Sequence, residues 1–133
     1  MSVYTTEITS DQIASDNPIH QRLLRAYYLA KPFVKGKLLE LGCGEGRGIE
    51  ILGSLVEQYT AIDKIVPIID RLKLKYPTHR FESGHFPPIP FPDNSFDSIV
   101  TFQVIEHIKD DELFVSEIKR ILRPGGIALM TTP

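Results

Sequence analysis

The chain has 133 residues, of which 42% are hydrophobic and 24% charged, with one cysteine and a formal net charge of −2. This length suits one domain, and a single cysteine excludes an internal disulfide and a cysteine-built zinc site. No apolar run approaches the roughly 20 residues of a membrane span, and the slightly acidic balance does not favour nucleic-acid binding. We therefore expect a cytoplasmic globular domain with neither a membrane nor a nucleic-acid partner.

The N-terminal part of the chain predicts a polar arm followed by a helix. Residues 1–16 are polar and are interpreted as the arm, and the folded domain is expected over residues 17–133. Asn17 is a suitable cap for the helix, and Lys31-Pro32 ends it. The apolar positions of this helix recur with helical spacing at Ile19, Leu23, Ala26, Tyr27 and Ala30.

The middle of the chain alternates between predicted strands and helices. Residues 37–41 form a short strand that runs into a glycine-rich turn, and the helix that follows carries Ile49, Leu52 and Val56. The next strand, residues 59–62, ends at Asp63. Pro67 begins a further helix that Pro77 closes, and residues 80–83 form the third strand.

The last third continues this alternation after a proline-dense connection. Residues 85–93 contain too many prolines for a helix or a paired strand. Residues 96–102 are predicted to be a strand buried on both faces, and residues 110–123 a helix that Pro124-Gly125-Gly126 ends. Residues 127–132 form a fifth strand. This alternation predicts an α/β fold with a parallel sheet and helices on both of its faces.

The turn after the first strand is the most informative stretch, because glycine alternates there at Gly42, Gly44, Gly46 and Gly48. Glycines allow a tight turn and let a ligand lie against the backbone, and ligands of open parallel sheets bind at such strand ends. The dinucleotide pattern G-x-G-x-x-G fails in both frames, since Arg47 or Ile49 stands at the third glycine position. No Gly-Lys-Ser or Gly-Lys-Thr follows either. The turn therefore predicts a ligand other than a dinucleotide or a nucleoside triphosphate.

The pattern acid-x-Gly-x-Gly-x-Gly, which starts at Glu40, resembles the class I S-adenosylmethionine-dependent methyltransferases of the small-molecule type. The resemblance covers roughly residues 19–133. It extends to the strings LLELGCGEGRG, AIDK, FPDNSFDSIVTFQVIEHI and EIKRILRPGGIALMTTP, in the order typical of the family. It implies a Rossmann-like doubly wound parallel sheet, S-adenosyl-L-methionine as cofactor, and methyl transfer to an O, N or C atom of a small-molecule acceptor.

The same resemblance implies which residues bind the cofactor. Glu40 is expected near the methionine amino group, Asp63 at the ribose hydroxyls, and Gln103 at the methionyl end of the pocket. The other cofactor-binding candidates lie in the glycine turn and after the second and third strands: Gly42, Cys43, Gly44, Gly46, Lys64, His85 and Phe86. Many family members carry an acid after the third strand for the adenine amino group. Because Ser83-Gly84-His85-Phe86 stands here, we expect backbone groups or stacking by Phe86 to replace it.

The catalytic residues are not identified by the sequence. His107 is a candidate general base for the acceptor. The pair Glu106-His107 resembles part of the metal set of small-RNA ribose methyltransferases, but Gln103 replaces its first glutamate and no further histidine follows, so no metal is expected. A binding or interaction domain without catalysis remains the alternative function, and a nicotinamide oxidoreductase is disfavoured by the glycine spacing.

The C-terminal strand bears on the extent of the domain. The family's sheet has two strands beyond the fifth, and this chain ends before them, so we expect a truncated sheet. Its last strand would present the apolar residues Ile127, Leu129 and Met130 at an uncovered edge. Uncovered apolar edges invite pairing with another chain, which predicts self-association.

Overall fold

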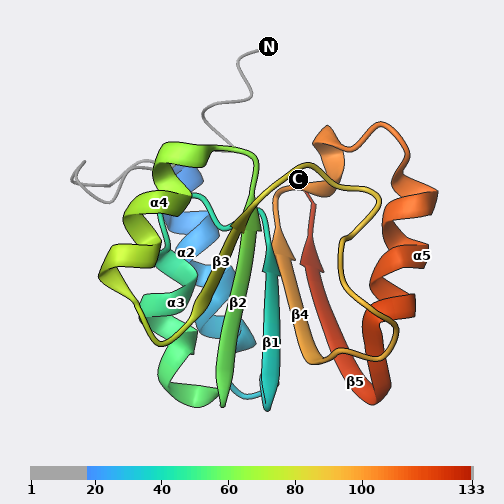
Figure 1. Cartoon of the computed structure of the whole chain (residues 1–133), viewed down its shortest axis with the longest axis horizontal. Coiled ribbons are helices and arrows are strands. Elements are labelled where there is room, and N and C mark those ends of the chain that lie inside the picture. The colour runs from blue at the N-terminus through green and yellow to red at the C-terminus, as the bar shows by residue number, and fades with distance from the viewer. Residues whose placement is uncertain (1–17, 133) are drawn as a thin grey trace.

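Five parallel strands form one sheet in the order β3-β2-β1-β4-β5 in the computed structural model, which describes residues 18–132 (Figure 1). The strands are β1 (Lys37–Leu41), β2 (Gln58–Asp63), β3 (Arg80–Ser83), β4 (Phe96–Phe102) and β5 (Leu122–Thr131). The predicted fold class, a doubly wound parallel sheet of about five strands, is confirmed.

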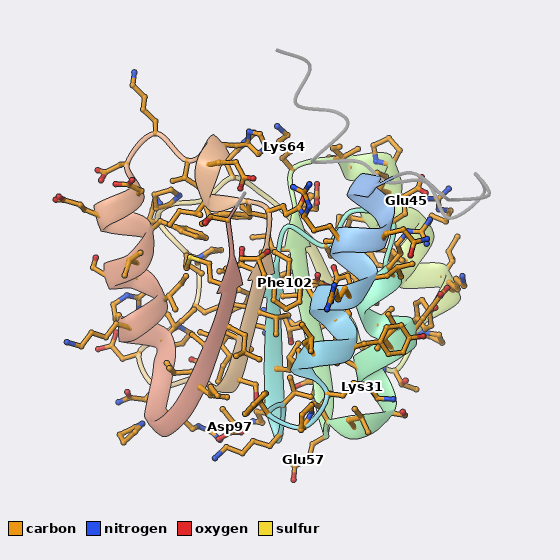
Figure 2. The ribbon with its side chains drawn as sticks, turned by 180° about the vertical axis from the view of Figure 1, so that it is seen from behind. Lys31, Glu45, Glu57, Lys64, Asp97 and Phe102 are labelled. Atoms are coloured by element: carbon orange, nitrogen blue, oxygen red, sulfur yellow. The ribbon has the colours of Figure 1, made fainter. Side chains whose placement is uncertain are left out.

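The helices cover both faces of the sheet. They are α2 (Pro18–Ala30), α3 (Arg47–Leu52), α4 (Val66–Lys75) and α5 (Asp111–Ile121), with single 3₁₀ turns at η1 (Gly53–Leu55) and η2 (Ile105–His107). Helices α2, α3 and α4 pack on one face and α5 on the other (Figure 1). Seen from behind, α2 crosses in front of the sheet beside Phe102 (Figure 2).

The strand order places a crevice next to the glycine-rich turn. From β1 the chain moves outward through β2 and β3, then returns to pair β4 with the other side of β1. The connections after β1 and β4 therefore leave the sheet in opposite directions, and ligands of open α/β sheets bind at such a switch point. The carboxyl ends of β1 and β4 consequently define where a ligand is expected.

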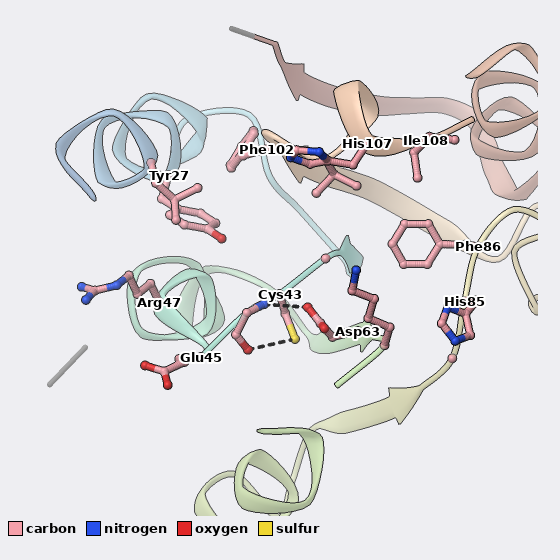
Figure 3. Close-up of a pocket in the computed structure, with 16 residues that line it drawn as sticks. Tyr27, Cys43, Glu45, Arg47, Asp63, His85, Phe86, Phe102, His107 and Ile108 are labelled. Carbon is pink, nitrogen blue, oxygen red and sulfur yellow. Dashed lines mark hydrogen bonds between the residues drawn. The ribbon is translucent and has the colours of Figure 1, made fainter. Parts of the chain in front are cut away.

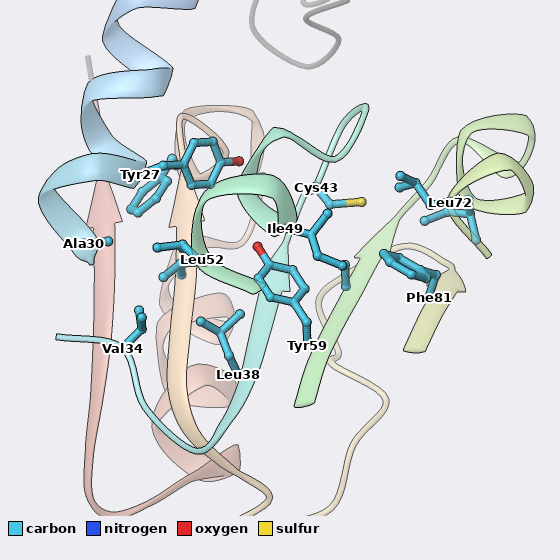
Figure 4. Packing of buried hydrophobic residues seen from close by; sticks show 14 of the residues in the cluster. Tyr27, Ala30, Val34, Leu38, Cys43, Ile49, Leu52, Tyr59, Leu72 and Phe81 are labelled. Atoms are coloured by element: carbon cyan, nitrogen blue, oxygen red, sulfur yellow. The ribbon is translucent and has the colours of Figure 1, made fainter. Parts of the chain in front are cut away.

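The two faces of the sheet have separate hydrophobic cores. The core under α2, α3 and α4 contains Tyr27, Leu38, Leu52, Tyr59, Ala61, Ile69, Phe81 and Val100, among others (Figure 4). The core under α5 contains Leu39, Leu41, Ile62, Ile89, Phe91, Ile99, Phe114, Ile118 and Ile121. Leu38, Leu39 and Ile99 are fully buried, as expected of central parallel strands with both faces covered.

Two helix ends differ from the sequence prediction. The helix after the glycine turn ends at Leu52, and Val56 follows the η1 turn in an extended conformation. Helix α5 ends at Ile121, so Leu122 and Arg123 belong to β5 and not to its last turn. The reason is that the N–H groups of residues 94 and 95 donate to the last helical carbonyls, those of Arg120 and Ile121, at 3.0 and 2.7 Å.

Some predictions concern segments at the ends of the chain. The polar arm over residues 1–16 and the Asn17 cap lie outside the described residues. Strand β5 lies at an edge of the sheet, as expected, while self-association through it stays a prediction. In the part of the chain that the structure describes, no helix has the length and apolar character needed to cross a membrane.

Candidate functional site

A cavity of about 880 Å³, its open mouth included, lies at the carboxyl ends of β1, β2 and β4 (Figure 3). The structure brings these predicted site residues together in its wall: Gly42, Cys43, Gly44, Asp63, Lys64, His85, Phe86 and His107. They come from four separate stretches of the chain, which only the parallel sheet places side by side.

The glycine turn needs its glycines for backbone shape and for packing. Gly42 and Gly46 have φ values of +80° and +92°, in the left-handed region that side chains disfavour. A Cβ atom on Gly42 would lie 2.6 Å from Val104 Cγ2, and one on Gly46 would lie 2.6 Å from Leu72 Cδ2. The backbone of the turn therefore lies directly against its neighbours, and its residues Gly42 and Gly44 line the cavity.

Asp63 holds the glycine turn in place. Its Oδ2 accepts a hydrogen bond from the Gly44 N–H at 3.0 Å, and its Oδ1 accepts one from the Ile65 N–H at 3.1 Å (Figure 3). The side chain is 6% exposed and lines the cavity. The Asp63 carboxylate therefore joins the glycine turn to the end of β2 within the cavity wall.

Glu40 lies beneath the turn and outside the cavity wall. It is 1% exposed, and its two carboxylate oxygens accept hydrogen bonds from the Tyr27 hydroxyl and, at 2.6 Å, from the Tyr59 hydroxyl. Burial raises the pKa of Glu40 from 4.5 to about 7, although the two tyrosine hydrogen bonds act in the opposite direction. Burial raises the pKa of both tyrosines as well, which keeps their hydroxyls protonated as donors.

Two further predicted residues lie behind the wall. Gly46 begins α3 and packs against Leu72 of α4. Gln103 is buried with a φ of +58°, and its N–H donates to the backbone carbonyl of Thr131 at 3.2 Å, which ties the end of β4 to β5. The neighbouring Val104 lines the cavity in its place.

Two aromatic groups bound the cavity on opposite sides (Figure 3). On one side Tyr27 meets Phe102 edge to face, with ring centroids 5.0 Å apart. On the other side Phe86 stacks on Phe114, a core residue of α5, at 5.7 Å. Asp63 lies between them, so the cavity offers a polar floor and two apolar walls.

The sequence analysis missed several lining residues: Leu23, Tyr27, Glu45, Arg47, Gly84, Phe102, Val104 and Ile108. Leu23 and Tyr27 belong to the apolar stripe of α2, which hydrophobic spacing alone assigns to the core. The signal for this helix is the resemblance of HQRLLRAYYLA to a helix that precedes the first strand and helps to close over the cofactor in many family members. Among the described residues, no three His, Cys, Asp or Glu side chains gather as a metal site requires.

Comparison with known proteins gives consistent matches. The methyltransferase domain model matches residues 39–130. A protein of Mycolicibacterium smegmatis, named a probable S-adenosylmethionine-dependent methyltransferase, is 36% identical over 97% of this chain and 51% of its own length. The fatty-acid O-methyltransferase of the same organism is 32% identical over 77% of this chain and 39% of its own length. The chain thus spans about half or less of these relatives.

Solved structures share the fold. The complex of DhpI with SAM and HEP superimposes with a TM-score of 0.71 at 22% identity, over 86% of this chain and 56% of that one. This likeness supports the sheet architecture described above. The family model covers more than half of the sequence, including the glycine turn, Asp63 and β4, and it agrees with the resemblance seen in the sequence motifs. The chain belongs to the methyltransferase domain family.

Proposed function

We propose that this domain binds S-adenosyl-L-methionine and transfers its methyl group to an O, N or C atom of a small-molecule acceptor. The proposal rests on the hydrogen bond between Asp63 and the glycine turn, which places a carboxylate and glycine backbone in one cavity wall. The name of the fatty-acid O-methyltransferase relative supports a small-molecule acceptor.

The residues of the cavity fit this cofactor chemically. The Asp63 carboxylate would accept hydrogen bonds from the ribose hydroxyls, with Lys64 beside it. His85 and Phe86 would lie against the adenine, whose flat apolar face suits the stacked Phe86 ring. The ribose and the methionyl part of the cofactor would lie along the glycine turn, against Gly42, Cys43 and Gly44.

The remaining predicted residues take indirect or chemical roles in this proposal. Gly46 and Gln103 would support the pocket from behind. When bound, S-adenosyl-L-methionine supplies a methyl group that its sulfonium already activates. The residues of the chain need to align the acceptor and exclude water, and an accessible base such as His107 would take a proton from the acceptor. We assign no metal to this chemistry.

Binding without catalysis is the alternative function. The chain spans about half the length of the first relative, so catalysis by that whole protein does not follow for this domain from the match. Cytoplasmic location, the absence of nucleic-acid partners and self-association through β5 are retained as predictions of the same proposal.

Calorimetry with S-adenosylhomocysteine, S-adenosylmethionine and NAD tests the proposed cofactor. We expect both adenosyl ligands to bind and NAD to give no signal. Binding of NAD without binding of either adenosyl ligand would overturn the proposal. Transfer of a labelled methyl group from S-adenosylmethionine into fractionated metabolites would then show that the domain is an enzyme. Without such transfer, binding without catalysis is the function that remains.

A further inference from the structure

We propose that Glu40 is a positioning residue that acts through Tyr27: it fastens α2 to the sheet and thereby sets one wall of the cofactor cavity. This inference rests on the proposed function for its ligand, but its structural part is independent of any ligand. It gives an indirect form to the role expected of Glu40 near the methionine amino group.

The first step is that Glu40 has no free access to the cavity. Its side chain is 1% exposed, and each of its oxygens accepts a hydrogen bond from a different tyrosine. A ligand amino group would need to displace a buried hydroxyl to reach it. The carboxylate therefore influences the cavity through the groups that it holds.

The second step is that the two tyrosines differ in what they join to Glu40. Tyr27 belongs to α2 and lines the cavity, where its ring also contacts Phe102. Tyr59 belongs to β2, the neighbour of β1 in the sheet, and is not part of the cavity wall in the described chain. The Tyr27 bond thus links a separate helix to the sheet, whereas the Tyr59 bond links two strands that backbone hydrogen bonds already join.

The third step is that the side chains around the Glu40 carboxylate are tightly packed. A Cβ atom on Gly48 of α3 would lie 2.5 Å from Glu40 Oε1 and 2.5 Å from the Tyr59 hydroxyl, and 2.7 Å from Tyr27 Cε1. Elements α2, α3, β1 and β2 therefore meet at this carboxylate. Loss of one hydroxyl cannot be compensated by water without displacing a neighbour.

The tyrosine pair provides a matched experiment. Tyr27→Phe and Tyr59→Phe each remove one hydroxyl from the same carboxylate and keep the ring. We expect Tyr27→Phe to weaken binding of S-adenosylhomocysteine by about five- to tenfold in calorimetry, and Tyr59→Phe to stay within about twofold. Both should lower the melting temperature by similar amounts, which controls for a general structural role.

Hydrogen exchange without ligand gives a second, independent measurement. Amides of α2 should exchange faster in Tyr27→Phe than in the parent, while Tyr59→Phe leaves α2 unchanged. Equal losses of affinity in both variants, or unchanged affinity in Tyr27→Phe, would overturn the positioning role. If the parent itself binds no adenosyl ligand, the proposed function fails, and unchanged exchange of α2 in Tyr27→Phe would then overturn the fastening as well.

Discussion

The two faces of the sheet are packed by different chemistry. The face under α5 is filled by leucine, isoleucine and phenylalanine side chains, including Leu39, Ile99 and Phe114. The face under α2, α3 and α4 surrounds a buried carboxylate, Glu40, with two tyrosine hydroxyls. The cavity lies at the carboxyl ends of the strands, where Tyr27 belongs to the second core and Phe86 stacks on Phe114 of the first.

This difference separates general stability from the shape of the site. Apolar contacts have no preferred direction, so the α5 face supplies stability wherever its area is buried. Hydrogen bonds at Glu40 have fixed directions and determine where one helix lies. We therefore expect substitutions on the α5 face far from the cavity to change stability alone, and substitutions around Glu40 to change the site as well.

The largest expected effect is on the apolar face. Ile121 is fully buried at the end of α5, and its carbonyl accepts from Ser95 at the end of the sheet opposite the cavity. Ile121→Ala should lower the free energy of unfolding by about 2–5 kcal/mol, and Ile121→Val by about 0.5–1.5 kcal/mol. Urea denaturation measures both. A tenfold change in ligand affinity of the folded valine variant would contradict the expectation that this part of the α5 face affects stability alone.

The second prediction concerns the pH dependence that Glu40 confers. Its pKa is about 7 when folded, against an ordinary 4.5, so the folded chain keeps a proton that the unfolded chain releases. The free energy of unfolding should therefore fall as pH rises from about 4.5 to 7, by up to roughly 3 kcal/mol. Urea denaturation at pH 5 and pH 8 should show this fall in the parent and a smaller one in Glu40→Gln. If the free energy of unfolding fell equally in both proteins, Glu40 would not titrate in this range.

A smaller effect is expected where α3 touches the carboxylate. Gly48→Ala would place a methyl group 2.5 Å from Glu40 Oε1, which should cost about 1–3 kcal/mol of stability and also weaken ligand binding. Gly53→Ala is the control, because its nearest contact is Ile49 Cγ1 at 3.0 Å and neither Glu40 nor the tyrosines lie near it. We expect the control to stay within about 1 kcal/mol of the parent in thermal melts. Equal effects of the two substitutions would argue against tight packing at Glu40.

The smallest effect is expected at the start of α5. Asp110 Oδ1 accepts a hydrogen bond from the Leu113 N–H at 3.0 Å and caps the helix. Asp110→Ala should cost about 1 kcal/mol, while Asp110→Asn keeps the acceptor and most of the stability. Ligand affinity should not change in either. An alanine variant as stable as the parent would show that the cap contributes nothing.

The fold could be predicted because its signals are local. The apolar run of β4, the helix stripes and the glycine turn each lie within about ten consecutive residues, and their alternation specifies a parallel sheet. Asp63 lines the cavity, and its position there follows directly from the end of β2. Such placements need no knowledge of distant contacts.

The features that the sequence did not predict depend on contacts between distant segments. The end of α5 is set by the N–H groups of residues 94 and 95, which no helix pattern includes. Glu40 shares the strand face of Leu38, and this alternation could have shown that it points into the helical core. That Tyr27 and Tyr59 meet there follows only from the packing of α2 and β2.

Two side chains of α5 hold the backbone of Ile89, in the middle of the connection between β3 and β4. Glu117 Oε1 accepts from the Ile89 N–H at 3.0 Å, and Arg120 donates to the Ile89 carbonyl at 2.9 Å. These two side chains pair with the N–H and the carbonyl of Ile89, as a neighbouring strand would. The prolines of the same segment lack N–H groups for such bonds. Ile89 thus lies between residues 84–86, which line the cavity, and residues 93–95, which also hydrogen-bond to α5. Changes in length or sequence over residues 84–88 can alter the ligand pocket during evolution while the entry into β4 stays unchanged.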